Sequence, residues 1–270
     1  MGKQTSIVRY TGKVGDLIGY YHKGKLCFRS RPASVNRSEA TKLSATDFGT
    51  ASKAGKLLRQ ALKQELSIRH DGDLTNRLNT SMLQVLYTGN QQKGGRRILR
   101  KNLEMLAGFK LNQNTELGRL LPFKPVVVQD RHSLRIAIPA LEARSILHAK
   151  NTTHVEIKAI AAGLNFNEGD YEQAASAKVL IDLRKPAEAT ELVLPFKAGD
   201  NETIVVLQVK AFSEEGGRLY ESGNRKYFAA DIIDIIPSLQ EESILPTYNA
   251  EREQKPVFIW KDTILVPQME

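Results

Sequence analysis

The side chains that most often carry catalysis are few in this chain of 270 residues, and they follow no recognisable spacing. Cys27 is the one cysteine, and no sequence feature marks a base that would activate its thiol. The acidic pairs at 214–215 and 241–242 fall in loop-like sequence, where a solvated surface is a simpler interpretation than acid–base catalysis. The histidines are scattered without metal-ligand spacing: His22, His70, His132, His148 and His154.

The glycines give no nucleotide-binding motif either. Gly12, Gly15 and Gly19 depart from the dinucleotide-binding spacing, and no helical pattern follows them. The stretch 49–57 resembles a phosphate-binding loop, but it has one residue too many between its glycines and lacks a hydroxyl residue after Lys56. We therefore predict no cofactor, no metal and no enzymatic activity, with an enzyme whose site is dispersed along the chain as an alternative.

Positive charge is the chemical signal that remains. Residues 1–31 contain seven lysines and arginines against one acid, Asp16, with four aromatic residues among them. A basic strand surface with aromatic neighbours can bind phosphates and stack on bases. A second cluster lies at a predicted helix start, where positive charge opposes the helix dipole. The candidate residues for binding a polyanion or a partner are Lys13, Tyr20, Tyr21, Lys23, Lys25, Arg29, Arg31, Arg96, Arg97, Arg100 and Lys101.

The two halves of the chain differ in charge. Residues 1–119 contain 22 Lys and Arg against 8 Asp and Glu, a net charge of +14, whereas residues 120–270 contain 17 against 22, a net charge of −5. Such asymmetry indicates that the basic half meets a polyanion or an acidic protein surface. A basic domain without such a partner is the alternative.

Short strands would position the first basic cluster. Between residues 25 and 31 the pattern alternates, which places Leu26 and Phe28 on one face and the basic side chains on the other. Lys23-Gly24 supplies a tight turn, so residues 1–31 are predicted to be a basic β-hairpin segment. An isolated hairpin is marginally stable in water, and we therefore expect this one to pack on something else.

Residues 32–121 are predicted to be a helical region. Apolar residues recur at spacings of three and four between Phe48 and Leu66, and Thr46 with Asp47 would begin this helix. Two further helices are expected at 73–87 and 96–107, separated by glycines.

The pattern changes after Pro122, where at least six short runs have strand character and are separated by turn signals. This favours an immunoglobulin-like or fibronectin type III-like antiparallel β-sandwich over residues 122–237, although the Cys…Trp…Cys spacing of antibody domains is absent. The predicted fold class is thus α+β, with an N-terminal β-hairpin and helical region followed by the sandwich. Residues 238–270 would form a proline-punctuated C-terminal arm whose terminal strand pairs within the chain or with another chain.

Several segments resemble a family of uncharacterised Bacteroidota proteins. Residues 12–20, then 23–25 and 28–32, are similar to that family's N-terminal pattern GKxGxxVGY…(R/K)GKxxxRSxP. Residues 136–140 and 153–154 resemble later segments of the same family. The resemblance implies a bacterial origin and a basic helical stretch before a β-rich half, and it carries no activity or catalytic residue with it.

These observations predict a non-enzymatic interaction or assembly protein of structural role. Its basic hairpin and strand edges would dock on a protein partner or on a second copy in a homo-oligomer. The alternative is a nucleic-acid-binding protein without sequence specificity. No apolar run is long enough to span a membrane, and the N-terminus lacks the pattern of a secretory signal. We therefore expect a cytoplasmic location, or a virion-associated one if the protein is phage-derived.

Overall fold

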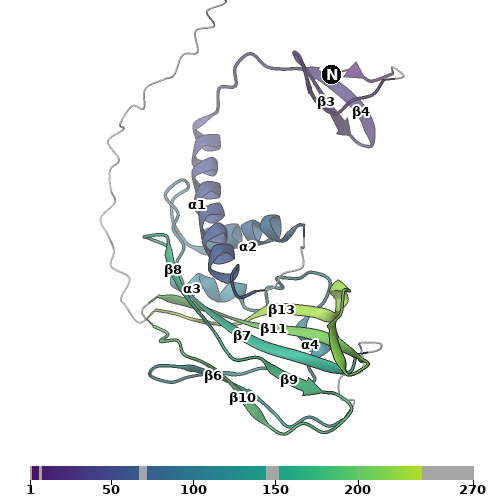
Figure 1. Ribbon diagram of the computed structural model, residues 1–270. Coiled ribbons are helices and arrows are strands. Elements are labelled where there is room, and N and C mark those ends of the chain that lie inside the picture. The colour runs from purple at the N-terminus through teal and green to yellow at the C-terminus, as the bar shows by residue number, and fades with distance from the viewer. Residues whose placement is uncertain (1, 6–7, 67–71, 144–151, 200, 239–270) are drawn as a thin grey trace, which may run out of the picture. The chain divides into compact units, whose positions relative to one another are not determined.

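The computed structural model describes residues 2–5, 8–66, 72–143, 152–199 and 201–238. Within these residues the chain is α+β, with helices and several antiparallel sheets (Figure 1). The terminal strand predicted for the C-terminal arm, the acidic pair at 241–242, His70 and His148 lie outside the described residues.

The N-terminal segment forms a four-stranded antiparallel sheet in the order β1-β4-β3-β2. Its strands are β1 (Gly2–Lys3), β2 (Gly12–Val14), β3 (Leu17–His22) and β4 (Lys25–Ser30). The predicted hairpin corresponds to β3 and β4. Its turn residues Lys23 and Gly24 have φ angles of 49° and 74°, and positive φ at both central positions is what a type I′ hairpin turn requires. The structure adds one strand on each side of this hairpin.

Helices occupy the next part of the chain. They are α1 (Glu39–Leu62), α2 (Leu74–Thr88), α3 (Arg100–Leu103), the 3₁₀ helix η1 (Glu104–Leu106) and α4 (Leu117–Leu120). The predicted start of the first helix at Thr46 is wrong, because the Ser38 side chain caps the helix by accepting a hydrogen bond from the Thr41 N–H at 3.3 Å. The third predicted helix is shorter than expected, and Arg96 and Arg97 precede it.

Two further antiparallel sheets follow, and they confirm the strand runs that the sequence predicted after Pro122. The strands of the six-stranded sheet are β7 (His154–Asn165), β8 (Asp170–Ala175), β9 (Val179–Asp182), β11 (Glu202–Glu215), β12 (Arg218–Glu221) and β13 (Phe228–Ile236). Those of the three-stranded sheet are β5 (Val127–Gln129), β6 (Leu134–Ile138) and β10 (Thr190–Leu194).

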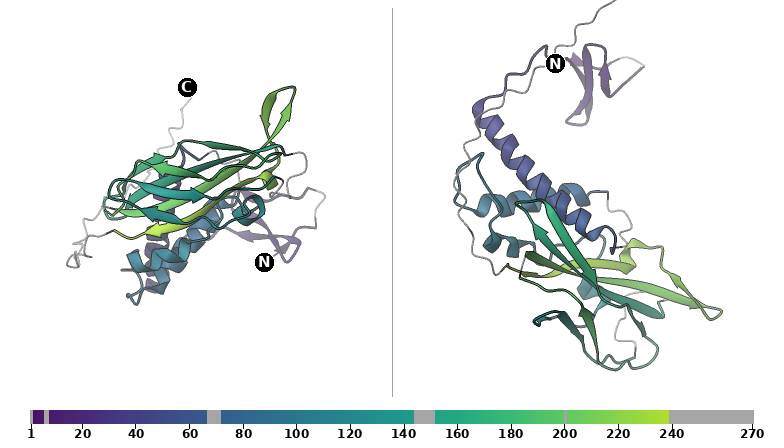
Figure 2. Two further views of the ribbon diagram at one scale, coloured as in Figure 1. Left: turned by 90° about the horizontal axis from the view of Figure 1, so that it is seen from below. Right: turned by 60° about the vertical axis from the view of Figure 1, so that its left-hand side comes forward.

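The six-stranded sheet has buried apolar side chains on both faces. On one face Ile160 of β7 and Val206 of β11 pack with Leu78 of α2 and other helical residues. On the other face Ile157 of β7 shares a core with Ile136 of the three-stranded sheet. Helices, large sheet and small sheet thus form three successive layers (Figures 1 and 2). Burial on both faces explains why residues 204–207 form a continuous apolar run instead of alternating.

Candidate functional site

Strand register sorts the side chains of the N-terminal sheet onto two faces. Residues directly opposite each other in paired strands share a face, so Lys13 lies with Ile18, and Ile18 lies with Arg29. By the same rule, Tyr20 and Lys3 both lie with Cys27 on this face. Lys25 and His22, which lie opposite each other in β4 and β3, are on this face as well. We name this surface the basic face: it carries Lys3, Lys13, Lys25 and Arg29 around a neutral centre of Ile18, Tyr20 and Cys27.

The centre of the basic face is covered and its cations are exposed. Cys27 is only 4% exposed, and the half-buried Tyr20 ring has the Arg29 guanidinium 5.8 Å from its centroid. A guanidinium at this distance over a tyrosine ring is a cation–π contact. Among the residues that the structure describes, no carboxylate lies within ion-pairing distance of the four cations of this face.

The opposite surface, which we name the apolar face, bears Val14, Leu17, Tyr21, Leu26 and Phe28. Tyr10, two residues before β2, lies over Gly19, where a Cβ atom would meet the Tyr10 carbonyl oxygen and ring. The Gln4 side chain holds this arrangement: its amide donates to the carbonyls of Tyr10 and Cys27 at 2.9 and 3.0 Å and accepts from the Tyr10 N–H at 3.0 Å.

This apolar face is only partly covered. A hollow of about 220 Å³ lies on it, lined in part by Val8, Tyr10, Leu17 and Phe28. Of the residues that line the hollow, Val8 is 77% and Leu17 39% exposed; on the apolar face, Tyr21 and Val14 are 66% and 56% exposed. Four large apolar side chains exposed on one small sheet are more than the scattered single residues that ordinary protein surfaces show.

The second predicted basic cluster does not form one surface. Arg96 donates to the Asp47 carboxylate at 2.6 Å, and its guanidinium lies 4.8 Å from the centroid of the Tyr87 ring. Arg100 forms an ion pair with Glu202 of β11 at 2.7 Å. Both arginines therefore hold parts of the fold together, while Arg97 and Lys101 are exposed.

The predicted binding residues are thus brought together only in part. Lys13, Tyr20, Lys25 and Arg29 share the basic face, whereas Tyr21 lies on the apolar face. Lys23 lies in the hairpin turn, and Arg31 follows β4 and donates its backbone N–H to the Asp16 carbonyl at 2.7 Å. Sequence reasoning did not select Lys3, because its place beside Cys27 depends on the two-residue strand β1, which no local pattern marks.

Among the histidines that the structure describes, His154 is the one with a carboxylate partner, and it borders a depression of about 430 Å³. Its Nδ1 lies 2.9 Å from the Thr153 hydroxyl, and its Nε2 lies 3.9 Å from the Asp182 carboxylate, beyond hydrogen-bonding distance. Arg184 binds both oxygens of Asp182, and these hydrogen bonds hold the Asp182 pKa well below its usual range. A carboxylate already occupied by arginine is typical of a structural ion pair, and it orients His154 poorly as a base.

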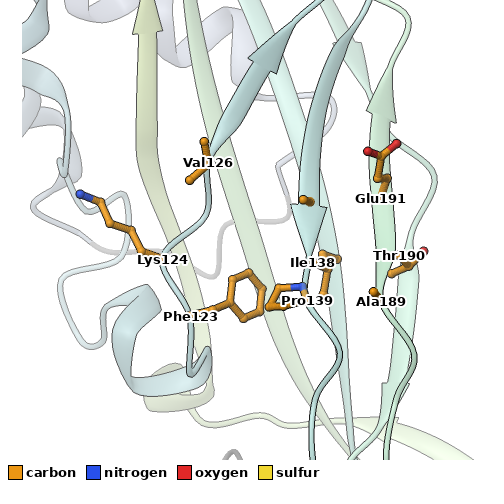
Figure 3. A pocket seen from close by; sticks show the side chains of 9 residues that line it. Phe123, Lys124, Val126, Ile138, Pro139, Ala189, Thr190 and Glu191 are labelled. Atoms are coloured by element: carbon orange, nitrogen blue, oxygen red, sulfur yellow. The ribbon is translucent and has the colours of Figure 1, made fainter.

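A wider groove of about 670 Å³ lies beside β6 and β10 (Figure 3). The Phe123 ring lies next to Pro139, and Val126 lies above them in this view. Lys124 and Glu191 are the charged residues among those that line the groove, and they are well apart. Its lining contains no histidine or cysteine.

Comparison of the chain with protein-family models, with curated proteins and with solved structures finds no match. Among the described residues, no group of three or more histidine, cysteine or carboxylate side chains is placed to hold a metal ion. None of the helices in the described part of the chain combines the length and the apolar character needed to cross a membrane.

Proposed function

We propose that this chain is a non-enzymatic assembly protein whose N-terminal sheet docks on a neighbouring subunit through its apolar face. The observation that carries the proposal is the contrast between this sheet and the rest of the fold. The six-stranded sheet is covered by apolar cores on both faces, whereas Cys27 is the buried apolar side chain among the described residues of the N-terminal sheet. A sheet with an apolar face gains stability by burying that face against a second layer.

A second copy of the chain is the partner that the charges favour. By strand register, Lys13, Lys25 and Arg29 lie on the face opposite the apolar face, so two apolar faces can meet without bringing these three charges together. Lys3, which lines the hollow, is the cation that would lie near such an interface. Such an interface is self-complementary, because each copy contributes the same patch. Val14 and Tyr21, exposed on the apolar face, would become buried in it.

The test is the oligomeric state of the full chain by size-exclusion chromatography with light scattering. We expect the wild-type chain to form dimers or larger oligomers. The double variant Val14→Ser, Tyr21→Ser should be mainly monomeric, because its self-association constant falls about tenfold or more. Val128→Ser with Val193→Ser is the matched control, because both valines are about half exposed on the three-stranded sheet. A wild-type chain that stays monomeric at high concentration contradicts the proposal.

We further propose that the β-rich part is an immunoglobulin-like or fibronectin type III-like sandwich. Strand order supports this: β5, β6 and β10 form one sheet, while β7, β11 and β13 are neighbours in the other. Lettered A, B, E and C, F, G in chain order, they match the ABE and CFG sets of the immunoglobulin fold.

The division of the chain at residues 31, 121 and 237 stays a prediction. The same holds for a cytoplasmic or virion-associated location.

A further inference from the structure

The cations of the basic face are arranged so that none lies directly opposite another. Like charges directly opposite each other in paired strands destabilise a sheet. Here no cation of the basic face faces another lysine or arginine: Arg29 and Lys13 both face Ile18, while Lys3 faces Cys27. Lys25 faces His22. Four cations therefore share one surface while the register keeps them apart.

The spacing of these cations fits an extended anion. Arg29 and Lys25 lie on the same strand four residues apart, a separation of about 13 Å along a strand. Lys13 and Lys3 lie on the two outer strands of the sheet, so the charge extends across its full width. A single small anion would contact one or two of these groups, whereas a chain of phosphates can contact all of them.

Tyr20 gives the face a second recognition element. Its ring lies in the third strand of four, half-buried between the cations, and the Arg29 guanidinium lies 5.8 Å from its centroid. A flat sheet face that presents an aromatic ring beside basic side chains is suited to unpaired bases, which stack on aromatic and guanidinium planes. Duplex DNA is more often read by a helix or ribbon that enters a groove.

We infer that the basic face binds single-stranded nucleic acid, with Lys3, Lys13, Lys25 and Arg29 contacting phosphates and Tyr20 stacking on a base. An acidic protein surface would satisfy the four cations but would leave the Tyr20 ring without a planar partner. The inference does not rest on the proposed subunit docking, because that uses the opposite face of the sheet. A negative result for nucleic-acid binding therefore does not contradict the proposed subunit docking, and the reverse also holds.

The test is fluorescence anisotropy with labelled 20-nucleotide oligo(dT) and oligo(U) between 50 and 200 mM salt. Contacts to four phosphates of a single strand predict a slope of log affinity against log salt of about −3. The variant Lys13→Gln, Lys25→Gln, Arg29→Gln should lose at least tenfold in affinity at low salt and most of that slope. Tyr20→Leu should lose about tenfold while keeping the slope, because stacking releases no counterions. The two oligonucleotides distinguish DNA from RNA as the ligand.

The matched control is Lys93→Gln, Arg97→Gln, Lys101→Gln, which removes the same charge from exposed positions outside the N-terminal sheet. Equal thermal melting curves for all variants exclude loss of folding as the cause. The inference is overturned if neither oligonucleotide binds at 50 mM salt, or if the control loses as much affinity as the basic-face variant. It is likewise overturned if poly-glutamate competes as well as the oligonucleotides, or if a duplex of the same length binds more tightly.

Discussion

The two clusters of basic residues look alike in the sequence, yet the structure uses them in different ways. In the segment that leads into α3, Arg96 is bound by the buried carboxylate of Asp47, and Arg100 by Glu202. In the N-terminal sheet, Lys13, Lys25 and Arg29 are exposed along one face. The first cluster stabilises the fold from within. The second presents its charge outward, which is the condition for binding something else.

The difference shows what a run of positive charge can and cannot indicate. A cation is available to a ligand only if no carboxylate of the same chain neutralises it, and that carboxylate can come from a distant part of the sequence. Asp47 lies in the middle of α1, and it also accepts the Gly94 N–H at 2.9 Å, so it fixes the loop before α3 onto the helix. Nothing in the local sequence of Arg96 predicts this partner.

Removal of the Asp47 carboxylate is expected to have the largest effect on stability. Asp47→Ala should lower the free energy of unfolding by about 3–5 kcal/mol, because the Arg96 guanidinium and the Gly94 N–H both lose a buried acceptor. Urea denaturation at pH 7 measures the change. Asp16→Ala, in the turn of the N-terminal sheet, is the control and should change it by less than about 0.5 kcal/mol. A cost below about 1 kcal/mol for Asp47→Ala would show that Arg96 is not held as described.

A second buried carboxylate, that of Asp231, accepts a hydrogen bond but forms no ion pair with any cation among the described residues. Asp231 of β13 accepts the Leu117 N–H at 3.0 Å, and its other oxygen has no hydrogen-bond partner among the described residues. Burial raises the pKa of Asp231 to about 6, while the neighbouring charges of Lys110 and Glu116 act in opposite directions. The folded chain therefore keeps this proton to a higher pH than the unfolded chain does.

The sign of the pH dependence follows from that difference. From pH 4 to pH 6 the unfolded chain loses the Asp231 proton before the folded chain does, so this group's contribution to the free energy of unfolding falls as pH rises. A pKa raised from 3.8 to about 6 corresponds to a loss of about 3 kcal/mol, complete by about pH 7. Asp231→Asn should flatten this part of the curve, because an amide oxygen can still accept the Leu117 N–H. Parallel urea curves for wild type and variant at pH 4.5 and pH 7 would contradict the assignment.

Much of the fold could be predicted because it depends on local periodicity. Alternation predicted β6 and β10, and it separated the basic side chains of β4 from Leu26 and Phe28. Long-range features could not be predicted in this way. The start of α1 at Glu39 was missed because Asp47 resembles a capping residue, although its carboxylate is used inside the fold.

The candidate site was predictable to the same extent. Lys13, Tyr20, Lys25 and Arg29 were selected from one segment of the sequence, but the separation of Tyr20 from Tyr21 required the register of β3 against β4. Lys3 required the pairing of β1 with β4, which joins residues far apart in the chain. The distinction between the two basic clusters depended in the same way on carboxylates that the sequence does not place near them.

The smallest effect is expected where the charge is exposed. Lys13→Gln, Lys25→Gln and Arg29→Gln together should change the local stability of the N-terminal sheet by no more than about 0.5 kcal/mol, because no described carboxylate pairs with these cations. Hydrogen exchange of the amides of β3 and β4, followed by mass spectrometry, reports this sheet separately from the rest of the chain. Unchanged protection would mean that the fold does not need the three charges. If protection falls by more than about 1 kcal/mol, the three cations stabilise the sheet as Arg96 stabilises the helical region, and the two basic clusters do not differ in role.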